Sequence, residues 1–343
     1  MLIIALMCSA IGQQAPPGKA KQHRSSSMAI RECFNWNFVK DDVSYIASGE
    51  DMAVWRRLTN DEERDRFIEQ FWQRRDPTPD TYENEFRDQY YERIIAANER
   101  YGNAKQEGWK TDRGQIYVMV GEPDSIKKSD AAEDWFYRFI ELPNLKEPQT
   151  NVKLHFVDVC HCGDLRLTID EADKDTYPKQ GSSLGGQKRP DLTQEVVDAY
   201  LTPSGTPRTQ FPLLERLIRE KLPLSELTMK ISADFQRVTN RVGRASIRFS
   251  LPADALSWHG TDKGQYATTR VYVRAITLTG KIAEVTEKEF KVAKEDTPTI
   301  SVVVPLYLYT GLYRLEVAFE DVTAAKVSTA TQSISVPEYG WCD

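Results

Sequence analysis

The sequence predicts an α+β protein in which N-terminal helices pack on an antiparallel sheet, followed by an immunoglobulin-like or fibronectin-like β-sandwich. Apolar residues recur with the helical period of 3.6 between about residues 60 and 102, and with the strand period of 2 in most later segments. Pro, Gly and Ser gather between 176 and 212 and separate two strand-rich regions. At 343 residues, the chain is long enough for two domains with separate cores.

The composition is typical of a soluble globular protein, with 40% hydrophobic and 28% charged residues. The formal net charge of −6 argues against nucleic acid as a partner, because phosphate binding requires a basic face. We therefore expect protein partners and no nucleic acid.

Residues 1–34 are predicted to be a signal-like segment followed by a flexible tether. The apolar run over residues 2–11 is too short to span a bilayer and suits a secretory signal, although the usual basic start is missing. Residues 13–34 are rich in Gln, Pro, Lys and Ser. The chain is thus expected to be exported and periplasmic or envelope-associated. Cys8 leaves open a lipid anchor, through which alone we expect contact with a membrane.

An α+β domain is predicted over residues 35–175, beginning with two helices. Asn60 and Glu63 resemble a capping box at the start of the first helix, which Pro77 ends. Gly102 is placed to end the second. The apolar faces are Phe67, Ile68, Phe71 and Trp72, and Phe86, Tyr90, Ile94, Ala97 and Tyr101.

Four strands are expected next, near 115–120, 134–140, 151–159 and 164–169. Short connections between them favour an antiparallel meander with the two helices on one face.

Residues 176–224 are predicted to be a linker with short helices around 195–201 and 213–221, and residues 225–338 the β-sandwich. Seven strand patterns lie at 227–238, 244–252, 268–277, 281–292, 299–308, 311–321 and 326–336. Thr279, Gly280 and Lys281 indicate a hairpin. Tyr313 fits either a tyrosine corner or an ordinary core position. Without cysteines in its strands, the sandwich must rely on packing, and the two parts are expected to fold independently.

Two tryptophan-containing motifs stand out: residues 108–112, which read Gly-Trp-Lys-Thr-Asp, and residues 71–79, which read Phe-Trp-Gln-Arg-Arg-Asp-Pro-Thr-Pro. We call them the first and second signatures. With them, the chain resembles the GWxTD domain family over roughly residues 36–175. The resemblance implies a bacterial, typically exported protein, often with a β-sandwich after this domain, and no assigned reaction.

The first signature is interpreted as a turn. Gly108 would permit a backbone conformation closed to other residues, and Trp109 would bury its ring beside the helices. Thr111 and Asp112 would accept backbone N–H groups and fix the turn into the first strand.

In the second signature, Trp72 lies on the apolar helix face, and the charges of Arg74, Arg75 and Asp76 suit a helix end. Because the resemblance places both signatures in one domain, we expect an Arg75–Asp112 contact that locks the conformation.

Three functional hypotheses follow. The first is a non-enzymatic envelope protein acting as an interaction or scaffold module, without a cofactor. The second is a hydrolase that uses Asp112 with Glu122 or Asp124 in a cleft beside the first strand.

The third hypothesis is a metal-binding or redox protein. Cys160, His161 and Cys162, with His155 nearby, carry suitable zinc donors, but their spacing differs from that of common zinc sites. On a strand, His161 would also point away from the two cysteines.

Overall fold

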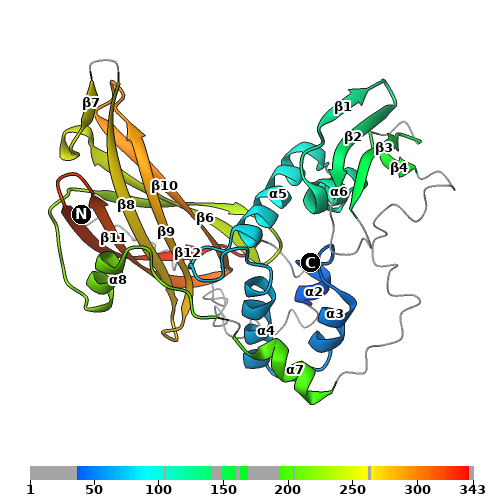
Figure 1. Ribbon diagram of the computed structural model, residues 1–343, viewed down its shortest axis with the longest axis horizontal. Helices are drawn as coiled ribbons and strands as arrows, with labels where there is room; N and C mark the ends of the chain where they lie inside the picture. Colours follow the sequence, from blue (N-terminus) through cyan, green and yellow to red (C-terminus); the bar gives the residue numbers. More distant parts are fainter. Residues whose placement is uncertain are drawn as a thin grey trace, which may run out of the picture. The chain divides into compact units, whose positions relative to one another are not determined.

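The computed structural model (Figure 1) describes residues 37–103, 106–140, 148–159, 163–168, 193–203, 205–261 and 264–339. The predictions for residues 1–34, including Cys8, and for Cys160, His161 and Cys162 lie outside these ranges. Within the described residues, no helix combines the length and the hydropathy needed to cross a membrane.

The N-terminal part of the chain begins with helices. They are α2 (Phe38–Asp41), α3 (Gly49–Trp55), α4 (Asp61–Gln73), α5 (Glu85–Tyr101), the 3-10 turn η1 (Gly108–Lys110) and α6 (Asp112–Val120). Side chains cap four of them, because Ser48, Asn60, Asn84 and Thr111 each accept a backbone N–H of the first turn. An aromatic core joins α2 to α5, and its members include Phe38, Trp55, Phe67, Phe71, Trp72 and Tyr90.

The helix α6 overturns the strand predicted at 115–120. Its apolar run, Ile116 to Val118, is buried, and such a short run does not distinguish a strand from a buried helix. Thr111 decides the matter, because its side chain caps a helix by accepting the Gly114 N–H at 3.1 Å.

A four-stranded antiparallel sheet follows, with the strands β1 (Ser125–Lys128), β2 (Ala132–Ile140), β3 (Gln149–Val157) and β4 (Arg166–Thr168) in the order β1-β2-β3-β4. One face carries Trp135, Tyr137, Leu154 and Phe156, all buried. This face meets α5 and the end of α6, since Trp135 lies 5.6 Å from the Tyr101 ring and the Tyr137 hydroxyl donates to the Gly121 carbonyl at 3.0 Å. The meander is therefore confirmed, and it starts at 125.

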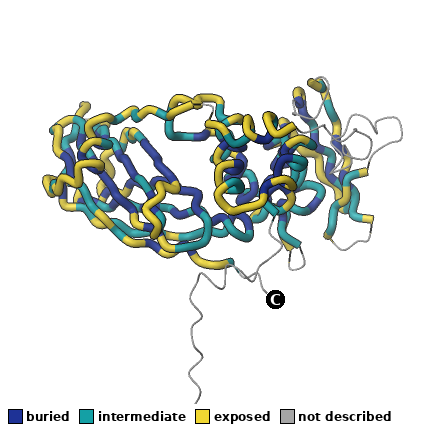
Figure 2. The backbone as a smooth tube through the Cα atoms, turned by 90° about the horizontal axis from the view of Figure 1, so that it is seen from below, coloured by how far each residue is buried: buried dark blue, intermediate teal, exposed yellow. Residues whose placement is uncertain are grey.

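The C-terminal part is a β-sandwich. Its strands are β5 (Lys230–Arg237), β6 (Val242–Pro252), β7 (His259–Thr261), β8 (Gly264–Thr277), β9 (Ile282–Ala293), β10 (Thr299–Tyr309), β11 (Gly311–Asp321) and β12 (Lys326–Val336). One sheet has the order β10-β6-β5, and the other has β12-β11-β8-β7 with β9 also paired to β8. Burial alternates along β6 and β10, so alternate side chains fill the space between the sheets. Figure 2 shows buried backbone positions beside intermediate and exposed ones along the chain.

These observations confirm the fold class, an α+β protein with an immunoglobulin-like or fibronectin-like sandwich. Two local predictions hold as well. Gly280 has a φ of +87° in the β8–β9 hairpin, which glycine adopts without strain. The Tyr313 hydroxyl donates to the Tyr309 carbonyl at 2.9 Å, four residues upstream, as in a tyrosine corner.

The two predicted helices of the linker are present, and they pack on different parts of the chain. The helix α7 (Gln194–Leu201) lies against α4, where the Tyr200 ring stacks on Phe67 at 6.1 Å. The helix α8 (Pro212–Arg219) covers the outer face of the larger sandwich sheet, burying Leu214, Leu217 and Ile218 there. The domain boundaries themselves stay a prediction.

Polar groups take part in the contacts between α5 and the sandwich strands. Arg87 on α5 makes a two-pronged ion pair with Glu284 on β9, at 2.8 and 2.6 Å. The Tyr307 hydroxyl donates to Glu92 at 2.5 Å, and its ring lies 5.1 Å from Tyr91. Such a polar interface is typical of contacts between domains of one chain.

Candidate functional site

The glycines of the first signature allow the backbone to pack against backbone. A Cβ added to Gly108 would lie 2.0 Å from the Ala97 carbonyl oxygen on α5. One added to Gly114 would lie 1.8 Å from the Gly108 carbonyl oxygen. Gly108 is not among the glycines with positive φ, so the expectation of a special backbone conformation was wrong. Position 108 requires glycine because the neighbouring backbone leaves no room for a side chain.

Trp109 holds η1 against α5 on one side and against Tyr45, between α2 and α3, on the other. It is 3% exposed, and its backbone N–H donates to the Asn98 side chain on α5 at 3.2 Å. Its carbonyl accepts the Tyr45 hydroxyl at 3.3 Å, with the two rings edge to face at 5.5 Å. Burial raises the pKa of Tyr45, and the carboxylates of Asp112 and Glu107 add to this, so the hydroxyl stays a donor. The predicted burial of Trp109 is confirmed.

Thr111 and Asp112 fix a turn into α6, and so begin a helix where we expected a strand. The Thr111 hydroxyl donates to the Gly108 carbonyl at 2.7 Å while accepting the Gly114 N–H. The Asp112 carboxylate accepts the Leu167 backbone N–H at 2.8 Å and lies 3.5 Å from Arg166. Asp112 thereby connects α6 to β4, the last strand of the sheet.

The arginines of the second signature converge on Asp51, which caps α3. Arg75 lies 2.7 Å from one Asp51 oxygen and Arg74 lies 3.4 Å from the other. Arg75 also donates to the carbonyls of Phe71, at 3.0 Å, and Ile46, at 3.3 Å. The expected Arg75–Asp112 contact is therefore wrong, because each residue is held by a different element. Asp51, which the sequence reasoning missed, carries a capping signal with Ser48.

The other two residues of this signature also have local roles. Trp72 is buried, and its carbonyl accepts the Asn84 side-chain amide at 2.8 Å. Asp76 accepts the Thr78 N–H at 2.9 Å after the end of α4. Partial burial raises the pKa of Asp76.

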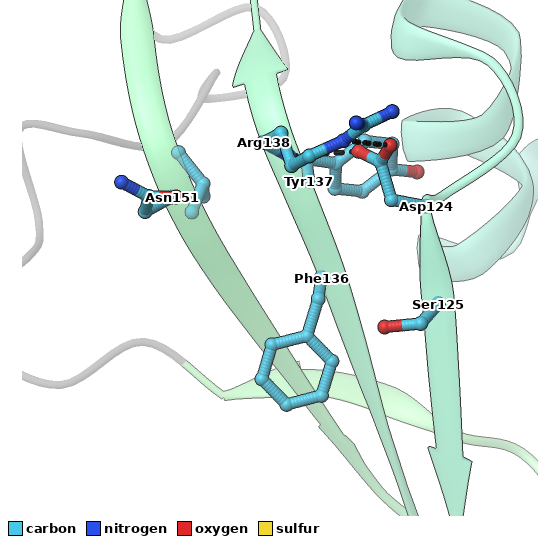
Figure 3. A pocket seen from close by; sticks show the side chains of 7 residues that line it. Asp124, Ser125, Phe136, Tyr137, Arg138 and Asn151 are labelled. Carbon is cyan, nitrogen blue, oxygen red and sulfur yellow. Dashed lines mark hydrogen bonds and ion pairs between the residues drawn. The ribbon is translucent and has the colours of Figure 1, made fainter.

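A pocket lies beside β1, β2 and β3 (Figure 3), and the side chains of Ser125, Phe136 and Arg138 line it from the sheet face opposite the one that meets the helices. Its cavity volume is about 430 Å³, within the range of small-ligand sites. The lining residues are Asp124, Ser125, Phe136, Tyr137, Arg138, Asn151 and Val152. Asp124 and Arg138 form a pair, in which the arginine donates from its backbone N–H at 2.7 Å and from Nε at 2.6 Å. These hydrogen bonds hold the pKa of Asp124 below its usual range.

Further charged groups surround the Phe136 ring on this face. The Lys127 ammonium lies 5.3 Å from the ring centroid, and that of Lys153 lies 5.8 Å away. Asp134 forms an ion pair with Lys153 at 2.9 Å and also contacts the His155 ring. Asp124 and His155 are sequence candidates on this face, and the alternation of 134, 136 and 138 with the core positions 135 and 137 could have indicated the others on β2.

The carboxylates of the hydrolase hypothesis are bound to three different sets of partners. As described above, Asp112 accepts the Leu167 N–H of β4, and Asp124 accepts hydrogen bonds from Arg138. Glu122 accepts from Arg100 at 2.9 Å and from the Tyr117 hydroxyl at 3.2 Å. Among the described residues, no group of three or more His, Cys, Asp or Glu side chains is arranged to hold a metal ion.

Residues 31–157 match the model of the GWxTD domain family. This part of the chain is therefore similar to the GWxTD domain family.

Several solved structures resemble the chain over a minor part of their own length. A glycosyl hydrolase family 2 member from Bacteroides cellulosilyticus DSM 14838 has 11% identity and a TM-score of 0.25, with 33% of this chain and 16% of that chain covered. A β-glucuronidase from Bacteroides uniformis has 14% identity and a TM-score of 0.23, with 31% and 13% covered. Likeness at these scores says nothing about activity. No curated protein matches the chain.

Proposed function

We propose that this protein is a non-enzymatic, exported envelope protein whose GWxTD domain and β-sandwich serve as an interaction or scaffold module for protein partners. The observation that carries the proposal is that the residues of the two signatures make contacts within the chain. Trp72, Trp109 and Thr111 are buried, and Arg75 and Asp112 are bound to groups of the same chain. Side chains that are engaged in internal contacts stabilise the fold and leave a partner little to bind. The other face of the four-stranded sheet, in contrast, carries exposed groups that a partner can reach.

Export of the chain is part of this proposal, and it rests on the apolar run and polar tether of residues 1–34. The expected partners are accordingly proteins of the envelope.

Site-specific photo-crosslinking in the native host tests the proposal. A photoreactive residue replaces Asn151, which is exposed and lines the pocket, and in a control it replaces Lys230, which is exposed on the sandwich strand β5. We expect a discrete crosslinked protein in the envelope fraction from position 151 and none of the same mass from position 230. Identical products from both positions, or protein recovered in the cytosol alone, would overturn the proposal.

A further inference from the structure

The strand β1 is an open edge of the sheet beside the pocket. In the described chain it pairs with β2 on one side, and all four of its residues are exposed. An edge strand leaves backbone N–H and C=O groups unpaired on its outer side. Those groups are what an extended peptide uses when it adds a strand to a sheet.

The register places three groups in a row beside this edge. Ser125 pairs with Phe136 and Lys127 pairs with Asp134, so Ser125, Lys127, Phe136 and Asp134 share the face that bears the pocket. Arg138 lies on the same face, two positions beyond Phe136 on β2. In the direction of the strands, the order on this face is therefore a cation at Arg138 and an aromatic ring at Phe136, both on β2, and then a cation at Lys127 on the edge strand β1.

The acidic groups on this face are already engaged. Both oxygens of Asp124 accept from Arg138, and Asp134 is held by Lys153 and His155. The Arg138 side chain is nevertheless 86% exposed, and Lys127 contacts the Phe136 ring. Because Arg138 is paired with Asp124 and Lys153 with Asp134, Lys127 gives this face an excess of positive charge, although the whole chain carries a net charge of −6.

We propose that β1 binds an extended acidic segment of a protein partner, which adds a fifth strand to the sheet. This inference rests on the proposed function and names the kind of partner. Residues on one face of a strand recur every second position, about 7 Å apart. The partner should therefore carry two acidic residues four positions apart, one level with Lys127 on β1 and one level with Arg138 on β2, and an apolar residue midway between them, level with Phe136.

A lysine on an edge strand commonly prevents pairing with other strands. Here the charge of Lys127 would make the pairing selective, because it disfavours neutral or basic strands and attracts acidic ones. A free backbone edge also favours a peptide over a nucleic acid, which has no groups to continue the sheet.

Fluorescence anisotropy with the full chain tests the inference. The probe is a labelled seven-residue peptide with glutamate at its second and sixth positions, valine at its fourth and threonine elsewhere. One comparison peptide has lysine in place of both glutamates. Another keeps the glutamates but has proline at its third and fifth positions, which removes backbone donors.

We expect the glutamate peptide to bind at least tenfold more tightly than either comparison peptide. Lys127→Glu and Arg138→Ala should each weaken its binding at least fivefold, while the control Lys230→Glu, also on an edge strand, changes it less than twofold. Lys127→Glu should in turn improve binding of the lysine peptide.

Three results would overturn the inference: equal binding of the proline peptide, equal loss in the Lys230 control, or displacement of the probe by an oligonucleotide with higher affinity. If these appear while position 151 still crosslinks to a protein, the strand-addition inference fails and the proposed function stands. Absence of crosslinking together with peptide binding at β1 would instead count against the proposed function.

Discussion

At the residue scale, the first signature is explained by close approach of backbone to backbone and not by side-chain chemistry. Gly108 lies against α5, and Gly114 lies against Gly108. The sequence marks these glycines but does not say which neighbour excludes a side chain, because that neighbour comes from another turn of the chain. Trp109 was predictable as a buried ring, since large aromatic residues beside amphipathic helices enter the core.

Gly114→Ala tests this steric explanation. Alanine favours a helix over glycine by about 1 kcal/mol, so propensity alone predicts stabilisation. Its Cβ, however, would lie 1.8 Å from a backbone oxygen that cannot rotate away. We expect a net loss of about 1–3 kcal/mol in the free energy of unfolding, measured with urea. Gly264→Ala is the control, because its Cβ would meet nothing within 4 Å and should change stability by less than about 0.5 kcal/mol. A neutral Gly114 variant would refute the explanation.

Asp124 gives a pH dependence at the same scale. Its folded pKa is lowered by hydrogen bonds from Arg138, so its contribution to stability is present above the unfolded pKa of about 3.9 and is lost as the pH falls through the folded value. A carboxyl-carbon NMR titration should show Asp124 titrating below 3.9. Arg138→Ala keeps the backbone donor, which is the larger cause, and removes the side-chain donor, so the pKa should move part of the way back towards that value. An unchanged pKa would rule out the contribution of the Arg138 side chain.

At the scale of elements, most helices and strands were predictable, and the errors have identifiable causes. The apolar stripe along α4 and the alternation of apolar and polar residues along β6 are each long enough to show the helix or strand period. The segment 115–120 is short and apolar, so its pattern alone does not distinguish a helix from a strand. The Thr111 side chain caps the helix α6 there, whereas the sequence prediction places Thr111 in a turn before a strand. The strand β1 was missed because its four exposed residues leave no alternation to detect. The candidate pocket depended on that strand and so was not predictable.

The contact between α3 and α4 depends on the second signature. Asp51 is 3% exposed and pairs with Arg75, which is 19% exposed. Removing Asp51 leaves a largely buried guanidinium without its partner, so we expect Asp51→Ala to cost about 3–5 kcal/mol.

A double-mutant cycle between Asp51→Ala and Arg75→Met, followed by urea unfolding, should give a coupling energy of about 1–3 kcal/mol. The exposed pair of Glu62 and Arg66 serves as the comparison and should give less than about 0.5 kcal/mol. Equal coupling in the two pairs would mean that the second signature does not hold α3 to α4.

At the scale of the whole molecule, two cores were predictable but the packing of the linker helices was not. All members of the large sandwich core lie between residues 227 and 339. Whether a short amphipathic helix packs forward or backward depends on complementary surfaces, which the sequence does not show. In the structure, α8 packs forward on Tyr272 and Val285 of the sandwich, and α7 packs back on α4.

Independent folding of the sandwich is our prediction at this scale. A fragment of residues 222–343 should show β-type circular dichroism and a cooperative transition, because its core is self-contained. A fragment of residues 210–343 should melt at a higher temperature, because it retains α8 and buries Leu214, Leu217 and Ile218. If both fragments are unfolded while the full chain melts in one transition, the polar contacts such as Arg87–Glu284 are required and the domains are not independent.

The central claim is that the signatures hold the fold and leave recognition to the open face of the sheet. Asp112→Ala tests it most directly, because Asp112 is the best acid candidate of the first signature and also the acceptor of the Leu167 N–H. Thermal unfolding and crosslinking from position 151 would be measured on the same variant. We predict a lower melting temperature, corresponding to about 0.5–2 kcal/mol, with crosslinking retained below that temperature. An unchanged melting temperature with crosslinking lost would contradict the claim and make Asp112 a functional residue.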